Sequence, residues 1–125
     1  ITLPMAQQAS EFLSFEGRWA REFHPVRSDW TNGSLLVENR RGRTSHEYPP
    51  VIFCGQRGFG EWGGEVWGAH VAWSGNHTMF AERLPDGRRY IQAGELLHPG
   101  EVVLESGQSY TCLLYPSHPA HEWSR

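Results

Sequence analysis

The chain has 125 residues, which is enough for one domain with a single hydrophobic core. Its net charge is −3, with 14 Asp and Glu against 11 basic residues, so neither nucleic acid nor an anionic membrane is an expected partner. No apolar run approaches the roughly 20 residues that span a bilayer, and Ile1 to Pro4 show no signal-peptide pattern, which favours a cytoplasmic protein. The first residue is not Met, so we expect a piece of a longer product or a processed one.

The predicted elements are almost all strands. The segment from Met5 to Leu13 is the one helix candidate, but its apolar pattern is short and poorly amphipathic, and the fold does not require it. Fourteen Gly and eight Pro divide the rest of the chain into short pieces. The expected strands are the β-branched and aromatic runs at 35–37, 51–53, 66–73, 78–80, 102–104 and 110–115. This spacing predicts an all-β fold, an antiparallel β-sandwich.

Turn-forming residues lie between these runs. Thr31-Asn32-Gly33 carries the Asn-Gly signal of a tight hairpin. Ser74-Gly75-Asn76 separates two predicted strands, and Pro85-Asp86-Gly87 joins Met79–Leu84 to Arg88–Gln92 because Pro presets the first turn dihedral and Gly accepts a positive φ. We therefore expect one hairpin at Asn32-Gly33 and a second at Pro85-Asp86-Gly87.

One segment, 64–73, alternates clearly enough to assign its faces. Trp67, Val71 and Trp73 would share one side of a strand, with His70 on the other. The side with the tryptophans is the predicted core face, although a slip of one residue would reverse the assignment.

Cysteine and histidine offer little chemistry. Cys54 follows an apolar run and is expected to be a buried, inert thiol, while a disulfide with Cys112 would require adjacent strands. His118 and His121 are three residues apart and could form half a metal site on a helix, but Pro119 favours a loop. We expect no metal and no other cofactor.

Two local patterns could concern sugars. Trp30 and Trp62 stand beside turns and are candidates for stacking on a sugar face, although tryptophan also fills the cores of small sandwiches. Glu61 and Glu65 flank Trp62 and could form the carboxylate pair of a glycosidase. The alternative for the two glutamates is a solubilising role at a strand edge, which we favour.

Four segments, taken in order, carry a family resemblance. They are Gly17-Arg18-Trp19-Ala20-Arg21-Glu22-Phe23-His24, then Glu38 to His46 with Arg41-Gly42 and Thr44-Ser45-His46, then Gly64-Glu65-Val66-Trp67-Gly68 with Trp73-Ser74-Gly75-Asn76, and finally Leu97-His98-Pro99-Gly100-Glu101 with Gly107-Gln108-Ser109-Tyr110-Thr111. Their sequence and spacing resemble family 36 of the glycoside hydrolases, the α-galactosidases also called melibiases. They cover about three-quarters of the chain.

The resemblance implies the N-terminal domain of a larger enzyme, a supersandwich of the galactose-mutarotase-like type. It implies a parent that releases terminal α-linked galactose with retention, using two aspartates on a following (β/α)₈ barrel. The family's motif at the first aspartate contains a lysine, and this chain has none. We therefore expect residues 1–125 to be one β-sandwich domain or a fragment of one, inactive alone, with an atypical tail at 112–125.

The resemblance also implies a role. In the family this sandwich packs on the barrel, helps to build a homo-oligomer and shapes the rim of the galactoside pocket. Arg40, Arg41 and His46 are the candidate contact residues, although they could equally be solvated strand-edge residues. The alternative function is a free-standing carbohydrate-binding sandwich that uses Trp30 and Trp62.

Overall fold

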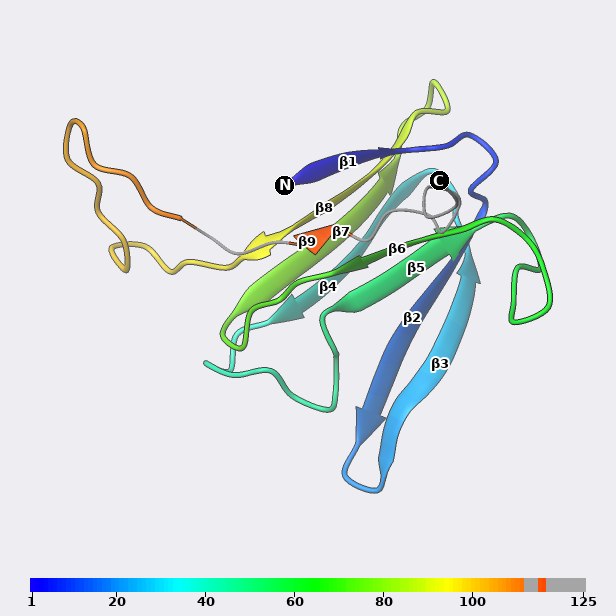
Figure 1. The fold of residues 1–125 in the computed structure, drawn as a ribbon, viewed down its shortest axis with the longest axis horizontal. Helices are drawn as coiled ribbons and strands as arrows, with labels where there is room; N and C mark the ends of the chain where they lie inside the picture. Colours follow the sequence, from blue (N-terminus) through cyan, green and yellow to red (C-terminus); the bar gives the residue numbers. More distant parts are fainter. Residues whose placement is uncertain (112–114, 117–125) are drawn as a thin grey trace, which may run out of the picture.

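The computed structural model describes residues 1–111 and 115–116 and consists of two antiparallel sheets packed face to face (Figure 1). The four-stranded sheet has the order β1 (Thr2–Met5), β8 (Arg89–Glu95), β7 (His77–Arg83), β4 (Gly33–Asn39). The five-stranded sheet has the order β3 (Arg21–Asp29), β2 (Glu11–Arg18), β5 (Val51–Gly55), β6 (Val66–His70), β9 (Tyr115–Pro116). The predicted antiparallel sandwich is confirmed. No helix, and so no membrane-spanning helix, occurs among the described residues, and the candidate at 5–13 is replaced by the end of β1 and the start of β2.

The β7–β8 hairpin forms as its turn residues predict. The N–H of Gly87 donates to the carbonyl of Leu84 at 2.9 Å, and the N–H of Leu84 donates to the carbonyl of Arg88 at 2.9 Å. Gly87 has φ +89°, which a residue with a Cβ rarely adopts. The Asp86 carboxylate accepts the N–H of Arg88 at 3.1 Å and closes the turn.

The Asn32-Gly33 hairpin prediction is wrong. β3 and β4 belong to different sheets, so this turn carries the chain across the sandwich rather than back along its own sheet. The reason is Trp30, which is only 2% exposed and packs on Phe12 with ring centroids 4.3 Å apart. Because this indole is buried between the two sheets, the chain passes from the sheet of β3 to the sheet of β4 at this point.

The β2–β3 hairpin had no counterpart among the expected strands. β3 is exposed along nearly its whole length and contains Pro25 opposite Phe15. A strand with these two features lacks the alternation of apolar and polar residues by which strands are predicted from sequence. They fit here because β3 is the edge strand of its sheet, where proline and solvated side chains are tolerated.

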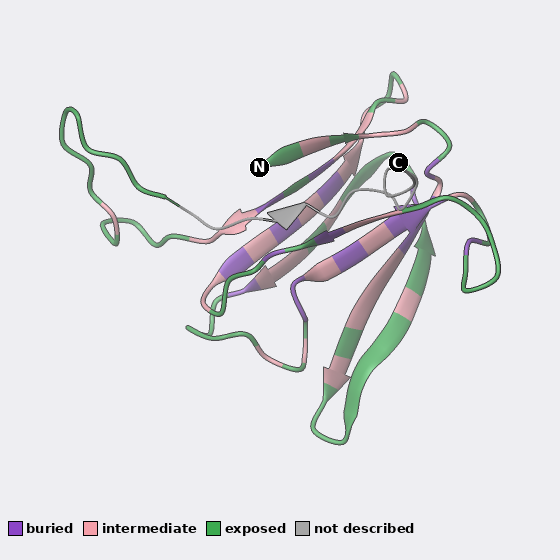
Figure 2. Cartoon of the chain, in the orientation of Figure 1, coloured by how far each residue is buried: buried purple, intermediate pink, exposed green. Residues whose placement is uncertain are grey.

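The core lies between the sheets, and buried residues alternate with less buried ones along β5 and β7 (Figure 2). The predicted inner face of the segment 64–73 is correct for Trp67 in β6 and for Val71 just after it, but Trp73 is 36% exposed. Cys54 is a free, buried thiol, and burial raises its pKa to about 12, which confirms the inert thiol. Its suggested partner Cys112 lies outside the described residues, as do His118 and His121.

Residues 96–111, which we call the arm, extend away from the sandwich (Figure 1). The strand predicted at 102–104 is wrong, because Val103 is 74% exposed and pairs with no strand of the described part of the chain. Two turns, with positive φ at Gly100 and Gly107, flank this apolar run. Of the strand predicted at 110–115, residues 110–111 are not in a strand, 112–114 are outside the described residues, and Tyr115 begins β9.

Two aliphatic residues on opposite faces of the four-stranded sheet test this packing. Ile91 is fully buried and Leu36 is more than half exposed. We expect Ile91→Ala to lower the free energy of unfolding by about 2–5 kcal/mol, because it leaves a cavity, and Leu36→Ala by less than about 1 kcal/mol. Urea denaturation followed by tryptophan fluorescence measures both. Equal losses would show that the outer face of this sheet is also covered.

Candidate functional site

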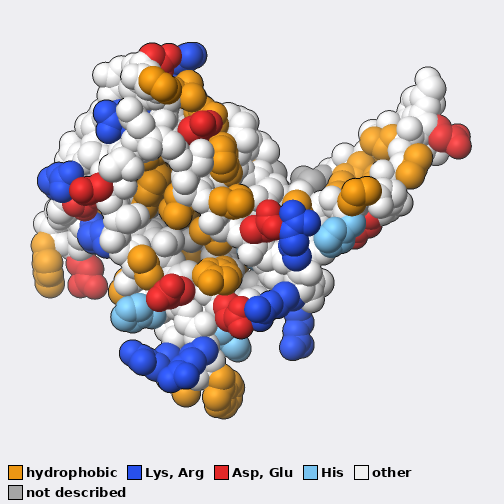
Figure 3. Space-filling model, turned by 180° about the vertical axis from the view of Figure 1, so that it is seen from behind, with side chains coloured by type: hydrophobic (Ala, Val, Ile, Leu, Met, Phe, Trp, Pro, Cys, Tyr) orange, Lys and Arg blue, Asp and Glu red, His pale blue; other side chains and the backbone are white. Residues whose placement is uncertain are grey.

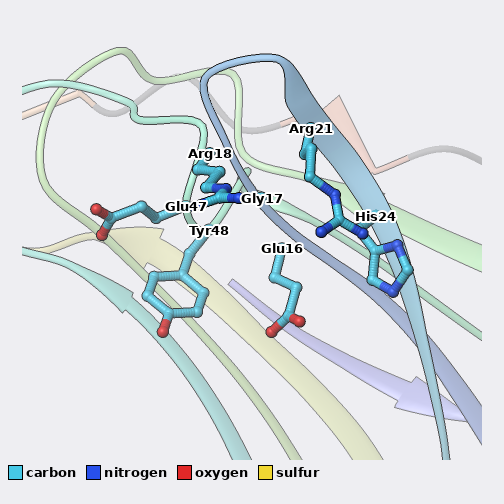
Figure 4. Close-up of a pocket in the computed structure, with 7 residues that line it drawn as sticks. All are labelled: Glu16, Gly17, Arg18, Arg21, His24, Glu47 and Tyr48. Atoms are coloured by element: carbon cyan, nitrogen blue, oxygen red, sulfur yellow. The ribbon is translucent and has the colours of Figure 1, made fainter.

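A pocket of about 360 Å³ lies at the turn end of the β2–β3 hairpin (Figure 4). Its lining residues are Glu16, Gly17, Arg18, Arg21, His24, Glu47 and Tyr48. Two of the four family-like segments meet here, because the N–H of Gly17 donates at 3.2 Å to the carbonyl of Glu47, the residue after His46. A Cβ on Gly17 would lie 2.5 Å from the carbonyl oxygen of Arg21 and 3.2 Å from that of His46. Only glycine permits this close approach.

We call residues 18–23, which form the turn itself, the hairpin tip. Their backbone is strained. Ala20 and Phe23 have φ values of +64° and +53°, although neither is glycine. The Glu22 carboxylate accepts the N–H of Ala20 at 2.9 Å. Hydrogen bonds from the backbone N–H groups of Glu22 and Ala20 lower the pKa of Glu22, the charge of His46 lowers it further, and partial burial opposes them.

The loop at 40–48 presents the three predicted contact residues at the surface. Arg40 pairs with Glu38, whose hydrogen bond and charge raise the pKa of Arg40. Arg41 pairs with Glu47 at 2.7 Å, and His46 is exposed beside the hairpin tip. Their role as contacts to another domain or subunit stays a prediction.

Asn76 connects this loop to the turn after β6 and to the arm. Its Oδ1 accepts the N–H of Gly42 at 2.7 Å, and its Nδ2 lies 3.2 Å from Nε2 of His98. Its carbonyl accepts the N–H of Leu96 at 2.9 Å. The N–H of Thr44 adds a further link to the carbonyl of Ser74 at 2.7 Å.

These contacts bring parts of all four family-like segments into one surface, while the 64–68 part of the third segment lies at the start of β6 beside the loop 56–65. The hairpin tip, the loop 40–48, the turn 72–76 and the base of the arm lie at one end of the sandwich, which we call the loop end, opposite the β7–β8 turn (Figure 1). Residues that are 20 to 34 positions apart in the sequence, such as Asn76 and Leu96 or Gly42 and Asn76, are thus hydrogen-bonded neighbours. An end surface built from loops on a rigid sandwich is a common place for binding.

The two tryptophans proposed for sugar stacking differ completely in exposure. Trp30 belongs to the core, so its ring faces are not available to a sugar, and this expectation is corrected. Trp62 is 97% exposed at the tip of the loop 56–65, between Gly60 and Gly63, whose backbones form a bridge. Trp62 stays a candidate, without a second ring from Trp30.

The base of the loop 56–65 is fixed by a buried carboxylate. Glu11 accepts the N–H of Gly58 at 2.9 Å and pairs with Arg27 at 3.0 Å. The hydrogen bond from Gly58 lowers the pKa of Glu11, partial burial opposes it, and Arg27 and Arg57 lower it further. Arg27 also lies 4.4 Å from the ring centre of Phe59, which is buried.

Of the proposed carboxylate pair Glu61 and Glu65, only Glu65 makes local structural hydrogen bonds among the described residues. Glu65 accepts a hydrogen bond from Gln8 at 3.1 Å and lies 3.4 Å from the amide nitrogen of Gln56. Glu61 is exposed near the loop tip. Within residues 1–111 and 115–116, no three His, Cys, Asp or Glu side chains are placed to hold a metal ion.

Comparison with known proteins assigns the sandwich to a family. Residues 1–105 match the model of the glycosyl hydrolase family 36 N-terminal domain. The chain is 51% identical over 121 residues to an α-galactosidase of Escherichia coli, covering 96% of this chain and 17% of that protein. It is 29% identical over 113 residues to the bifunctional α-galactosidase/sucrose kinase AgaSK of Mediterraneibacter gnavus, covering 87% of this chain and 12% of AgaSK.

Solved structures agree with this assignment. The α-galactosidase AgaA from Geobacillus stearothermophilus superimposes with a TM-score of 0.71 at 26% identity, over 76% of this chain and 13% of AgaA. The galactosidase domain of AgaSK gives the same TM-score at 27% identity, with the same coverage of both chains. The chain thus spans less than a fifth of the length of these relatives. It belongs to the N-terminal domain of glycosyl hydrolase family 36 α-galactosidases.

Proposed function

We propose that this chain is a non-catalytic framework of a longer α-galactosidase, and that its loop end docks on the rest of that protein. The observation that carries the proposal is the meeting of parts of all four family-like segments at one exposed end of the sandwich, through Gly17, Gly42, Asn76 and His98. Residues needed only for folding would be spread through the core. Here the shared residues instead build a surface of loops and charged side chains.

The proposal includes the chemistry of the parent enzyme. The relatives are named α-galactosidases, and we infer that the parent hydrolyses terminal α-galactosides with retention, in the cytoplasm, without a metal. The acidic groups that cleave the bond would lie on a following (β/α)₈ barrel. Docking of the loop end on that barrel would place Arg40, Arg41 and His46 beside the rim of the sugar pocket, where loops can exclude water.

The first test concerns activity. The purified 125-residue chain should not hydrolyse nitrophenyl α-galactoside, because it supplies a framework and not the acidic pair. If turnover appeared and disappeared in Glu65→Gln but not in Glu82→Gln, the carboxylates beside Trp62 would be catalytic and the proposal would be wrong.

The second test concerns docking. In a chimera, this chain would replace the matching segment of the Escherichia coli α-galactosidase, to which it is 51% identical. Arg41 and Arg88 are matched, since each is exposed in one ion pair, at 2.7 Å and 2.8 Å, but they lie at opposite ends of the sandwich. Arg41→Ala should lower the thermal midpoint of the chimera by about 2–4 °C for each kcal/mol by which it weakens docking, and Arg88→Ala should leave the midpoint unchanged. Equal shifts of the thermal midpoint in the two variants would show that the loop end is not the docking surface.

A second candidate function rests on Trp62 alone. A ring that is 97% exposed could stack on a sugar in a free-standing binding module. Calorimetry with galactose and raffinose distinguishes the two functions. The framework predicts no heat of binding at millimolar sugar. Binding that is lost in Trp62→Ala and kept in Trp19→Ala would favour the module.

A further inference from the structure

The pocket at the turn end of the β2–β3 hairpin is bordered by two like charges that face each other. Arg18 and Arg21 are direct partners in the β2–β3 ladder, and both line the pocket. Side chains in such positions have Cβ atoms about 5 Å apart, and like charges placed there destabilise a sheet. Neither guanidinium group forms an ion pair with a described residue. The pair therefore has no negative partner among these residues.

A β-bulge in β3 brings a third nitrogen-bearing side chain to the same pocket. Two residues of β3, 22–23, lie opposite Gly17 alone, and the second of them, Phe23, has φ +53°. In a regular strand, residues three apart point to opposite faces. Because of the extra residue, Arg21 and His24 both line the pocket. Bulges often re-aim side chains beside functional sites, and a strained backbone is typical of such sites.

The carboxylates near the pocket do not neutralise this charge. Glu47 is paired with Arg41 at 2.7 Å, outside the pair of facing arginines. Glu22 accepts the N–H of Ala20 at 2.9 Å. The carboxylate of Glu16 points away from both guanidinium groups (Figure 4). The arginine side of the pocket is thus suited to an anionic group from solution.

The pocket is accessible and is large enough for more than an ion. The end of the hairpin projects from the sandwich and carries arginine side chains at its surface (Figure 3). The volume of about 360 Å³ lies in the range typical of sites for small organic ligands. The remaining wall includes Tyr48, which is 49% exposed, and Glu16. A tyrosine ring packs on the C–H face of a sugar, and a carboxylate accepts hydrogen bonds from its hydroxyl groups.

We propose that this pocket binds a phosphorylated sugar, whose phosphate group accepts hydrogen bonds from Arg18 and Arg21. A phosphate monoester is favoured over a carboxylate because its three terminal oxygens can serve two guanidinium forks at once. The sugar ring lies on Tyr48, and one of its hydroxyl groups donates to Glu16. This site goes beyond the framework role, because all its residues belong to this chain and it needs no docked domain.

Calorimetry on the 125-residue chain tests the ligand class. The probes are glucose 6-phosphate, inorganic phosphate and glucose, at one pH and at an ionic strength balanced with sodium chloride. Glucose 6-phosphate should bind with a millimolar or lower Kd, and inorganic phosphate about tenfold more weakly, because it lacks the contacts to Tyr48 and Glu16. Glucose should give no heat of binding, because it lacks the charged group.

Single substitutions assign the contacts. Arg18→Gln and Arg21→Gln should each weaken the binding of glucose 6-phosphate by about 10–100-fold, because each removes charge-assisted hydrogen bonds. Tyr48→Leu should bring the Kd for glucose 6-phosphate close to that for inorganic phosphate. Arg88→Gln is the matched control, since Arg88 is an exposed arginine at the opposite end of the sandwich, and it should leave both Kd values unchanged.

Thermal unfolding separates a binding role of the arginines from a structural one. In sodium chloride alone, Arg18→Gln and Arg21→Gln should keep or raise the thermal midpoint, because each removes a like-charge contact. Saturating glucose 6-phosphate should raise the midpoint of the wild type and of Arg88→Gln, but not that of either pocket variant. A lower midpoint of the pocket variants in chloride would give the arginines a structural role instead.

Three binding results would overturn the proposal. Equal Kd values for inorganic phosphate and glucose 6-phosphate would mean that the pocket takes the ion alone. Equal weakening by Arg18→Gln and Arg88→Gln would mean that the ligand responds only to overall charge. Absence of binding by the wild-type chain would leave the arginines as solvated surface residues. None of these results depends on docking of the loop end, which the chimera tests separately.

Discussion

The hydrogen bonds of Asn76 are the constraint on which the loop end depends. This one residue accepts from Gly42 and Leu96 and contacts His98, and so ties the loop 40–48, the turn after β6 and the arm together. Its neighbour His77 is fully buried. The turn therefore has little freedom to move, and the polar network is anchored directly to the core.

The anchoring explains how a small sandwich can hold so many loops in place. The close approach of Gly17 to the carbonyls of Arg21 and His46 fixes the hairpin against the same loop that Asn76 holds from the other side. The loop 40–48 is thus held at two points, by the backbone of Gly17 and by the side chain of Asn76. Its charged side chains are left to face outward, where they can meet a partner.

Local turn chemistry was predictable from the sequence, and long-range choices were not. Pro85-Asp86-Gly87 makes its hairpin because every requirement of the turn lies within the turn. Asn32-Gly33 has equally good local chemistry, but the burial of Trp30 decides which sheet the chain enters. The run at Val103 is apolar, yet a strand also needs a neighbour, and the sequence does not say whether the fold supplies one.

For the candidate site too, local patterns were predictable from the sequence and long-range contacts were not. The four family-like segments were visible as patterns, but their contact with one another depends on strand register, which joins Gly17 to Glu47 and Gly42 to Asn76. Trp30 and Trp62 look alike in the sequence, since both stand beside turns. Only the packing of the two sheets separates the core residue from the exposed one.

Edge strand β3 has a consequence for how such a domain is made. An N-terminal domain leaves the ribosome early in synthesis, and an open sheet edge at that stage invites pairing with another nascent chain. Pro25 cannot donate a ladder bond, and charged residues such as Arg27 and Asp29 flank it along the strand. The proline and charged residues that made β3 hard to predict from sequence thus protect the nascent chain from aggregation.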